Sequence, residues 1–164
     1  MSIKNKTKKT KGFTLTELLV TILIAGILMV YALPSFSNFI KSQNVINETN
    51  DLVTDLTFAR VEALNTGIDT VVEPMDQGDW MTGRRIYADN DGDGSFSGAD
   101  ELLRVKEDID PGLNITGAGS VGFDNQGAST DDTSVRSISI EHSSNPAHKV
   151  VSVALSGLIT TKEG

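Results

Sequence analysis

The chain opens with a short polar, basic segment and then turns apolar for about twenty residues. From Phe13 to Leu33 the only charged residue is Glu17. About 20 consecutive apolar residues are enough for a helix to cross the roughly 30 Å hydrocarbon core of a bilayer. The pattern therefore predicts a transmembrane helix over residues 13–34. Glu17 is a functional candidate, because a carboxylate inside a membrane is costly unless it finds a partner.

After Pro34 the apolar residues return at helical spacing, up to about residue 64. We expect one face to pack on an outer domain through Phe36, Phe39, Ile40, Ile46, Val53, Leu56 and Ala63. Polar residues, Glu48 and Asp51 among them, occupy much of the remaining surface. Gly67 suits the left-handed position that ends a helix. Residues 35–66 are thus predicted to continue the same helix outside the membrane, with a bend at Pro34.

From residue 67 to 164 short alternating runs replace the helical pattern, and clusters of Gly and Asp separate them. The predicted strands are 68–72 (ending before Pro74), 80–88, 102–105, 113–116, 121–123, 135–140, 150–155 and 158–160. The sequence therefore predicts an α+β fold. A long N-terminal helix, its first half transmembrane, packs on an antiparallel β-sheet domain.

The charge of the chain is uneven. Residues 1–12 hold five lysines and no acid, while the whole chain has a formal charge of −8. Without that segment 14 − 5 = 9 basic residues face 22 acidic ones, a formal −13. Nucleic-acid binding depends on neutralising phosphates, so we expect no nucleic-acid partner. The chain has no cysteine, which excludes disulfides and thiol chemistry.

The start of the apolar run reads Lys11-Gly12-Phe13-Thr14-Leu15-Thr16-Glu17-Leu18-Leu19. With the lysines before it, this stretch resembles the type III signal of type IV pilins and pseudopilins. The resemblance implies that prepilin peptidase removes the leader, residues 1–12, by cutting between Gly12 and Phe13, and that Phe13 is then N-methylated. It also implies that Glu17 neutralises the N-terminal amine of a neighbouring subunit during assembly.

Simpler interpretations exist for the same residues. The apolar run alone also fits an uncleaved signal anchor, and Glu17 lies near enough to the cleaved end to stay hydrated among the headgroups. In each case the lysines favour a cytoplasmic N-terminus, because positive charge stays inside. We therefore expect a single-pass inner-membrane protein with a periplasmic C-terminal domain.

A second resemblance lies further along the chain. The segment 50–63, with Ala59-Arg60-Val61-Glu62-Ala63 near its end, resembles the helix end of the GspH/FimT family of minor pilin-like proteins. Residues 123–127 and 155–157 also resemble later segments of that family. The resemblance implies a subunit that works with other pilin or pseudopilin subunits in assembling a type II secretion pseudopilus, for protein secretion across the outer membrane.

Three alternatives stay open. The first is a minor pilin that primes a type IV pilus, which uses the same signal and helix. The second is a DNA-uptake pilin, which the acidic domain and a C-terminal tail without arginines disfavour. The third is a bitopic membrane protein with a calcium-stabilised outer domain and no part in a fibre.

An acidic loop over residues 89–101 offers the only constellation for a cofactor. Its spacing is similar to that of a calcium-binding EF-hand loop, with oxygen ligands at alternate positions and Gly94 at position six. The candidate calcium ligands are Asp89, Asp91, Asp93, the Ser95 carbonyl, Ser97 and Asp100. The loop departs from the EF-hand pattern because position twelve is Asp rather than Glu. A polar hairpin loop without metal explains the same composition equally well.

No catalytic arrangement is found in the sequence. His142 and His148 stand apart in a polar segment, and no nucleophile–base pair or phosphate-binding loop accompanies them. We therefore expect a protein that is not an enzyme. The aromatic residues Trp80, Tyr87, Phe96 and Phe123 are expected to pack in the core.

Overall fold

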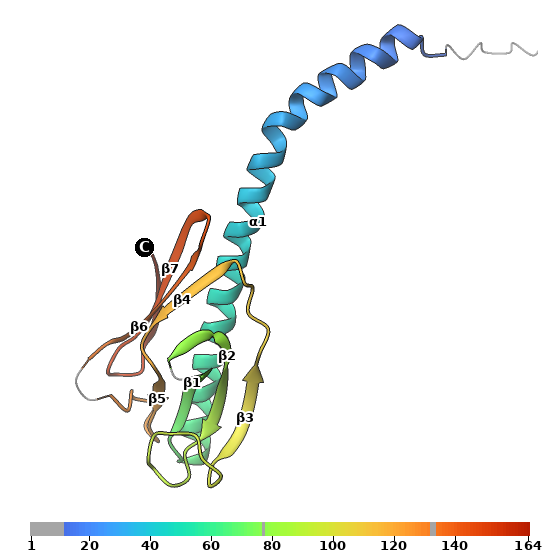
Figure 1. Ribbon diagram of the computed structural model, residues 1–164. Coiled ribbons are helices and arrows are strands. Elements are labelled where there is room, and N and C mark those ends of the chain that lie inside the picture. The colour runs from blue at the N-terminus through green and yellow to red at the C-terminus, as the bar shows by residue number, and fades with distance from the viewer. Residues whose placement is uncertain (1–11, 77, 132–133) are drawn as a thin grey trace, which may run out of the picture. The chain divides into compact units, whose positions relative to one another are not determined.

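The computed structural model describes residues 12–76, 78–131 and 134–164 (Figure 1). The predictions for residues 1–11 of the leader lie outside the described residues. The elements are α1 (Leu15–Thr66), β1 (Thr70–Asp76), β2 (Asp79–Ala88), β3 (Glu101–Lys106), β4 (Leu113–Gly117), β5 (Val121–Phe123), β6 (Arg136–His142), β7 (Asn145–Val153) and β8 (Ile159–Glu163). The predicted α+β class is confirmed, since one long helix precedes antiparallel strands.

The chain divides into two compact units, which are described separately. The first ends at Ser37 and holds the N-terminal part of α1. The second, Asn38–Gly164, holds the rest of α1 and all the strands. The helix ends as expected, with the Gly67 N–H bonded to the Ala63 carbonyl and Gly67 at a φ of 73°.

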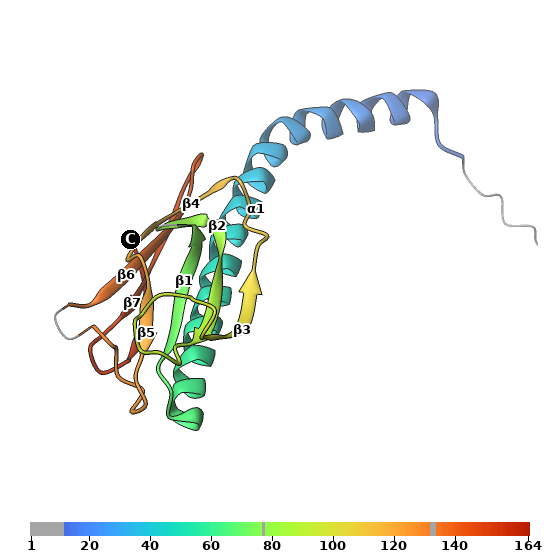
Figure 2. The same ribbon diagram turned by 60° about the horizontal axis from the view of Figure 1, so that its bottom comes forward.

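The strands of the second unit form two four-stranded sheets within the described residues. The first, sheet A, has the order β3-β2-β1-β5, and the second, sheet B, has the order β4-β6-β7-β8. Both share a core with the second half of α1, and Figure 2 shows the strands of sheet A directly beside that helix. The sequence predicts the strands but not this division, because pairing partners are set by contacts between distant segments.

One hydrophobic core joins the helix to both sheets. Buried side chains come from α1 (Val45, Leu52, Leu56, Ala59 and Ala63), from sheet A (Val72, Trp80, Ile86, Val121 and Phe123) and from sheet B (Leu113, Ile115, Ile138, Ile140, Val151 and Val153). The helical residues recur at intervals of three, four and seven, which places them on one face. Burying such side chains is the main favourable term in folding.

The predicted buried face of the helix is partly wrong. Leu56 and Ala63 are buried, but Phe36, Phe39 and Ile40 are exposed. The first fully buried helical residue is Val45, where the hydrophobic core shared with the sheets begins. Glu48, assigned to the polar surface from sequence, is also buried.

Two strand boundaries differ most from the prediction. β1 continues through Pro74 to Asp76 instead of ending before the proline. This is tolerated because β5 pairs only with Thr70, Val71 and Val72, so β1 has a single neighbour at Pro74. β7 begins at Asn145 rather than at residue 150, because its polar first half continues the hairpin with β6.

Candidate functional site

The N-terminus of α1 is closed by Thr14 and Glu17. The Thr14 backbone N–H and hydroxyl donate to Glu17 Oε2, at 3.1 and 3.0 Å, and the Glu17 N–H donates to Thr14 Oγ1 at 3.2 Å. This reciprocal pattern is a capping box, which satisfies N–H groups that a helix start leaves unpaired. This capping role was not predicted from the sequence, although Thr-x-x-Glu before an apolar run is its signature.

Both hydrogen bonds that reach the Glu17 carboxylate use Oε2. Among the described residues no donor reaches Oε1, and the side chain is exposed. The carboxylate therefore keeps one oxygen available for a cation outside the chain while it caps the helix. Gly12 and Phe13 precede the helix and are also exposed, Phe13 by 85%.

The first part of α1 is apolar and uncovered. Side chains such as Leu19, Ile22 and Leu28 are more than half exposed. By length and composition this helix is able to cross a membrane. Exposed apolar surface of this extent marks a region that is covered by lipid or by other protein.

A cluster of charged residues, buried at its centre, ties sheet A to the helix. Arg84, 2% exposed, donates through Nε to Asp55 Oδ2 at 2.7 Å and through Nη1 to Glu48 Oε1 at 2.5 Å. Arg104 binds the other oxygen of Asp55 at 2.9 Å, and the Lys106 ammonium binds Glu48 Oε2 at 2.9 Å. We call these five residues the Arg84 network. Burial tends to lower the pKa of Lys106, but hydrogen bonds to Asp51 and Glu48 raise it overall.

The side chain of Arg60 joins three segments that are far apart in the sequence. Its Nε donates to the Gly127 carbonyl at 2.8 Å, and its Nη2 donates to the Ser156 carbonyl at 3.3 Å. Gly127 follows β5 and Gly157 lies in the turn before β8. A Cβ on Gly157 would lie only 1.8 Å from the Gly127 oxygen, so no other residue fits there. The three segments that carry the GspH/FimT resemblance therefore meet at one junction.

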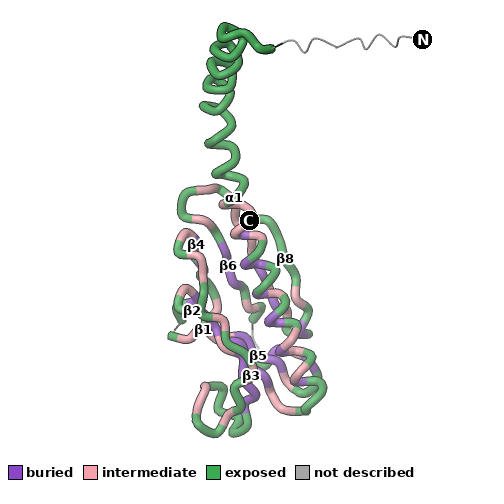
Figure 3. The backbone as a smooth tube through the Cα atoms, turned by 90° about the vertical axis from the view of Figure 1, so that its right-hand side faces the viewer, coloured by how far each residue is buried: buried purple, intermediate pink, exposed green. Residues whose placement is uncertain are grey.

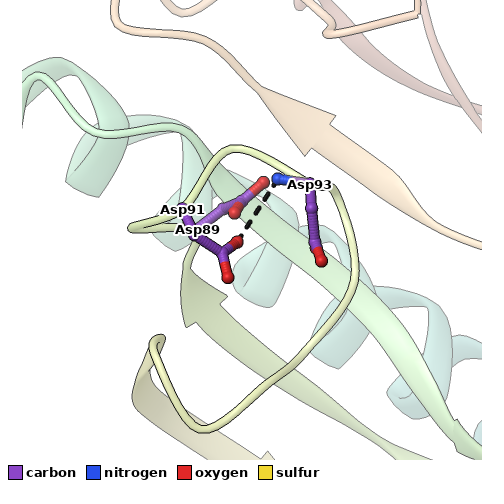
Figure 4. A group of neighbouring side chains, drawn as sticks. All are labelled: Asp89, Asp91 and Asp93. Carbon is purple, nitrogen blue, oxygen red and sulfur yellow. Dashed lines mark hydrogen bonds between the residues drawn. The ribbon is translucent and has the colours of Figure 1, made fainter.

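The acidic loop connects β2 to β3 and brings three of the predicted ligands together. Ligand oxygens of Asp89, Asp91 and Asp93 lie within 4.8 Å of one another (Figure 4). Asp89 accepts from the Gly92 and Gly94 N–H groups, both at 2.8 Å, and the Ser97 hydroxyl donates to Asp91. Such spacing suits calcium, whose oxygen ligands lie 2.3–2.6 Å from the ion.

The remaining predicted ligands close the loop instead. Asp100 accepts hydrogen bonds from the backbone N–H groups of Asn90 and Ser97, at 2.9 and 2.7 Å. Ser95 donates its N–H to Asp93 at 2.7 Å. Nearby, burial and the charges of Asp124 and Asp89 raise the pKa of Asp69. The grouped carboxylates fit calcium, and the loop's own hydrogen bonds fit a metal-free turn, so calcium binding stays a prediction.

A calorimetric titration of the protein with calcium tests this prediction. We expect a dissociation constant of roughly 10⁻⁴–10⁻³ M, as for extracellular modules. Asp91→Ala should remove binding, because it takes away one of three grouped carboxylates. Asp108→Ala, which removes an exposed carboxylate between β3 and β4, is the matched control and should bind normally. The absence of heat up to millimolar calcium would exclude the site.

The other residues singled out from the sequence have structural roles in packing and hydrogen bonding. Trp80, Tyr87 and Phe123 are buried as predicted. Burial raises the pKa of Tyr87, and the nearby negative charge of Glu73 raises it further. Phe96 is half-buried, with its ring centroid 5.3 Å from that of Tyr87. His148 lies in β7 and bonds to Ser139 at 2.7 Å.

A capped apolar helix that continues into a helix-and-sheet domain defines a pilin-like subunit. Residues 48–157 match the family described as Type II transport protein GspH, and residues 7–33 match the Prokaryotic N-terminal methylation motif. The chain belongs to the GspH family. It is a minor pilin-like subunit that takes part in assembly of a type II secretion pseudopilus, as the resemblance implied.

Solved structures agree on the fold. A crystal structure of the type IV minor pilin FimU from Pseudomonas aeruginosa strain PAO1, in space group P21, is 19% identical and has a TM-score of 0.58. The match covers 77% of this chain and 92% of the FimU chain. A second crystal form, P65, gives 18% identity, coverages of 73% and 91%, and a TM-score of 0.53. A search of curated proteins finds no significant match.

Proposed function

We propose that the chain is inserted in the inner membrane with its N-terminus in the cytoplasm, cut by prepilin peptidase between Gly12 and Phe13, and methylated on Phe13. The observation that carries this proposal is the match to the methylation motif over residues 7–33, on the N-terminal side of the GspH match over residues 48–157. The mature subunit then leaves the membrane as part of a pseudopilus, with its outer domain in the periplasm. Its work is structural, and no reaction is assigned to it.

The geometry at the helix start supports a role for Glu17 in this assembly. Its Oε2 is used by Thr14 for capping, while no described donor reaches Oε1. The amine of a neighbouring subunit's first residue can therefore pair with Glu17 without breaking the cap. Within a bundle of apolar helices such a pair sets the register, because an unpaired buried charge is strongly disfavoured.

A deletion strain tests the proposed function. We expect secreted proteins to disappear from the medium while surface pili remain at normal number, and the wild-type gene to restore secretion. Protein levels inside the cells are the control, since they separate lost secretion from lost synthesis. Normal secretion with lost pili would contradict the proposal.

That contrary result would favour the second candidate, a minor pilin that primes a type IV pilus. The specific observation on its side is the likeness of the fold to the type IV minor pilin FimU. A role in DNA uptake has no such support, because 22 acidic residues outnumber 14 basic ones, five of which lie in the leader.

A further inference from the structure

Each sheet of the outer domain has two edge strands, and an edge strand leaves backbone N–H and C=O groups unpaired. The segment after β5 returns beside it, since Ser129 bridges Phe123 and the Thr130 N–H bonds to the Gly122 carbonyl. β4 lies next to β2 of the other sheet. In the part of the chain that the structure describes, β3 and β8 are the two edges left uncovered.

These two edges differ in regularity. The pairing of β3 with β2 skips Leu103, which makes a β-bulge, and Arg104 and Lys106 are tied to acids of α1. β8 pairs with β7 through all its 5 residues without a shift, and its residues 159–161 are β-branched. Bulges protect an edge from other strands, whereas a regular β-branched edge favours pairing. β8 is therefore the edge better suited to accept a strand.

A groove runs between β8 and the second half of α1. Two cavities of about 390 and 270 Å³ adjoin there, because both are lined by Ile46, Lys149 and Glu163. Thr49 on the helix and Thr161 on β8 both line the smaller cavity. Figure 3 shows β8 exposed beside α1. A strand laid against β8 would extend sheet B over the helix and direct alternate side chains into this groove.

The charges at the groove indicate what kind of segment fits it. Of the 14 − 5 = 9 basic residues after the leader, six form salt bridges and Arg60 binds two carbonyls. Lys41 and Lys162 have no such partner among the described residues. Lys162 lines the groove at the open edge of an otherwise acidic domain. An acidic residue on the incoming segment would complement it.

We infer that the β8 edge and this groove form a docking site for an extended segment of a neighbouring pilin-like subunit, with a carboxylate opposite Lys162. The class of partner rests on the proposed function. Main-chain hydrogen bonds to β8 supply affinity, and the groove beside Ile46 selects side chains. A second copy of this chain fits less well, because each copy brings 9 basic and 22 acidic residues and the two domains repel.

Site-specific photocrosslinking of the full-length protein tests the inference in cells that contain the other subunits. The natural chain has no cysteine, so a maleimide–benzophenone probe labels only an introduced one. Thr161→Cys places the probe on β8, and Val105→Cys on the β3 edge is the matched control. We expect an adduct from Thr161→Cys to an extended segment of another subunit with a prepilin signal. Adding Lys162→Glu should lower the yield about tenfold, because like charges then face each other.

Several results would overturn the docking site. The labelled Thr161→Cys variant could give no adduct, or an adduct in the same yield as Val105→Cys. Its adduct could also contain only a second copy of this chain, or a protein without a prepilin signal. Equal thermal stability of the variants is the control for folding. The complementation experiment separates the two proposals. Restored secretion with a missing adduct refutes the docking site alone, whereas a wild-type gene that does not affect secretion refutes the proposed function.

Discussion

Glu17→Gln is expected to abolish secretion while the subunit still reaches the membrane. Glutamine keeps the capping box, because Glu and Gln both serve at this helix position. It removes the charge, however, so the neighbouring subunit's amine would lie buried without a partner. Breaking a buried ion pair from one side costs about 3–5 kcal/mol. Since 1.4 kcal/mol is a factor of ten, this corresponds to roughly 10²- to 4 × 10³-fold weaker incorporation into the fibre.

The measurement is secretion in the deletion strain complemented with each variant. Thr14→Ala is the matched control, since it removes the hydroxyl that bonds to Glu17 Oε2 but keeps the carboxylate. It should cost the helix about 1 kcal/mol and leave most secretion intact. Mass spectrometry should show the loss of residues 1–12 and one added methyl group for both variants. Full secretion with Glu17→Gln would exclude the charge-pairing role, and an intact leader would exclude the processing step.

The capping box shows how local signals make part of the site predictable. Thr14 and Glu17 are three residues apart before an apolar run, and that spacing alone is sufficient to place their hydrogen bonds. Gly67 likewise ends α1 where its conformational freedom predicts. The strand with the clearest alternation, predicted over 135–140, was also placed to within two residues, since β6 covers Arg136–His142. Each of these features depends on neighbours within a few residues.

The features that could not be predicted depend on distant segments. Glu48 and Arg84 are 36 residues apart in sequence, and polarity alone assigned Glu48 to the surface. Alternation along β2 sends Arg84 into the helix interface and leaves Arg85 to pair with Glu73, but which acids of the helix meet Arg84 depends on how distant segments pack. Helical periodicity likewise does not predict that Phe39 is exposed, because its exposure depends on which part of the helix the core covers.

Arg84→Met is expected to destabilise the outer domain by about 3–5 kcal/mol, because Glu48 and Asp55 would remain buried without their shared cation. The loss should exceed that from deleting an ordinary surface charge. Arg85→Met is the matched control, because Arg85 is the next residue of β2 and its ion pair with Glu73 is more exposed. An exposed pair contributes about 0–1 kcal/mol. Urea unfolding of the full-length chain in detergent gives both free energies of unfolding.

Arg84 connects sheet A to α1 through Glu48 and Asp55. Arg84 Nη2 has no hydrogen-bond partner among the described atoms, so the network is not fully satisfied. Replacing buried ion pairs by apolar residues is often neutral or stabilising. A combined Glu48→Leu, Asp55→Leu and Arg84→Met variant should therefore recover much of the stability that Arg84→Met loses. Failure to recover, or equal losses for Arg84→Met and Arg85→Met, would show that packing rather than this ion network holds sheet A on the helix.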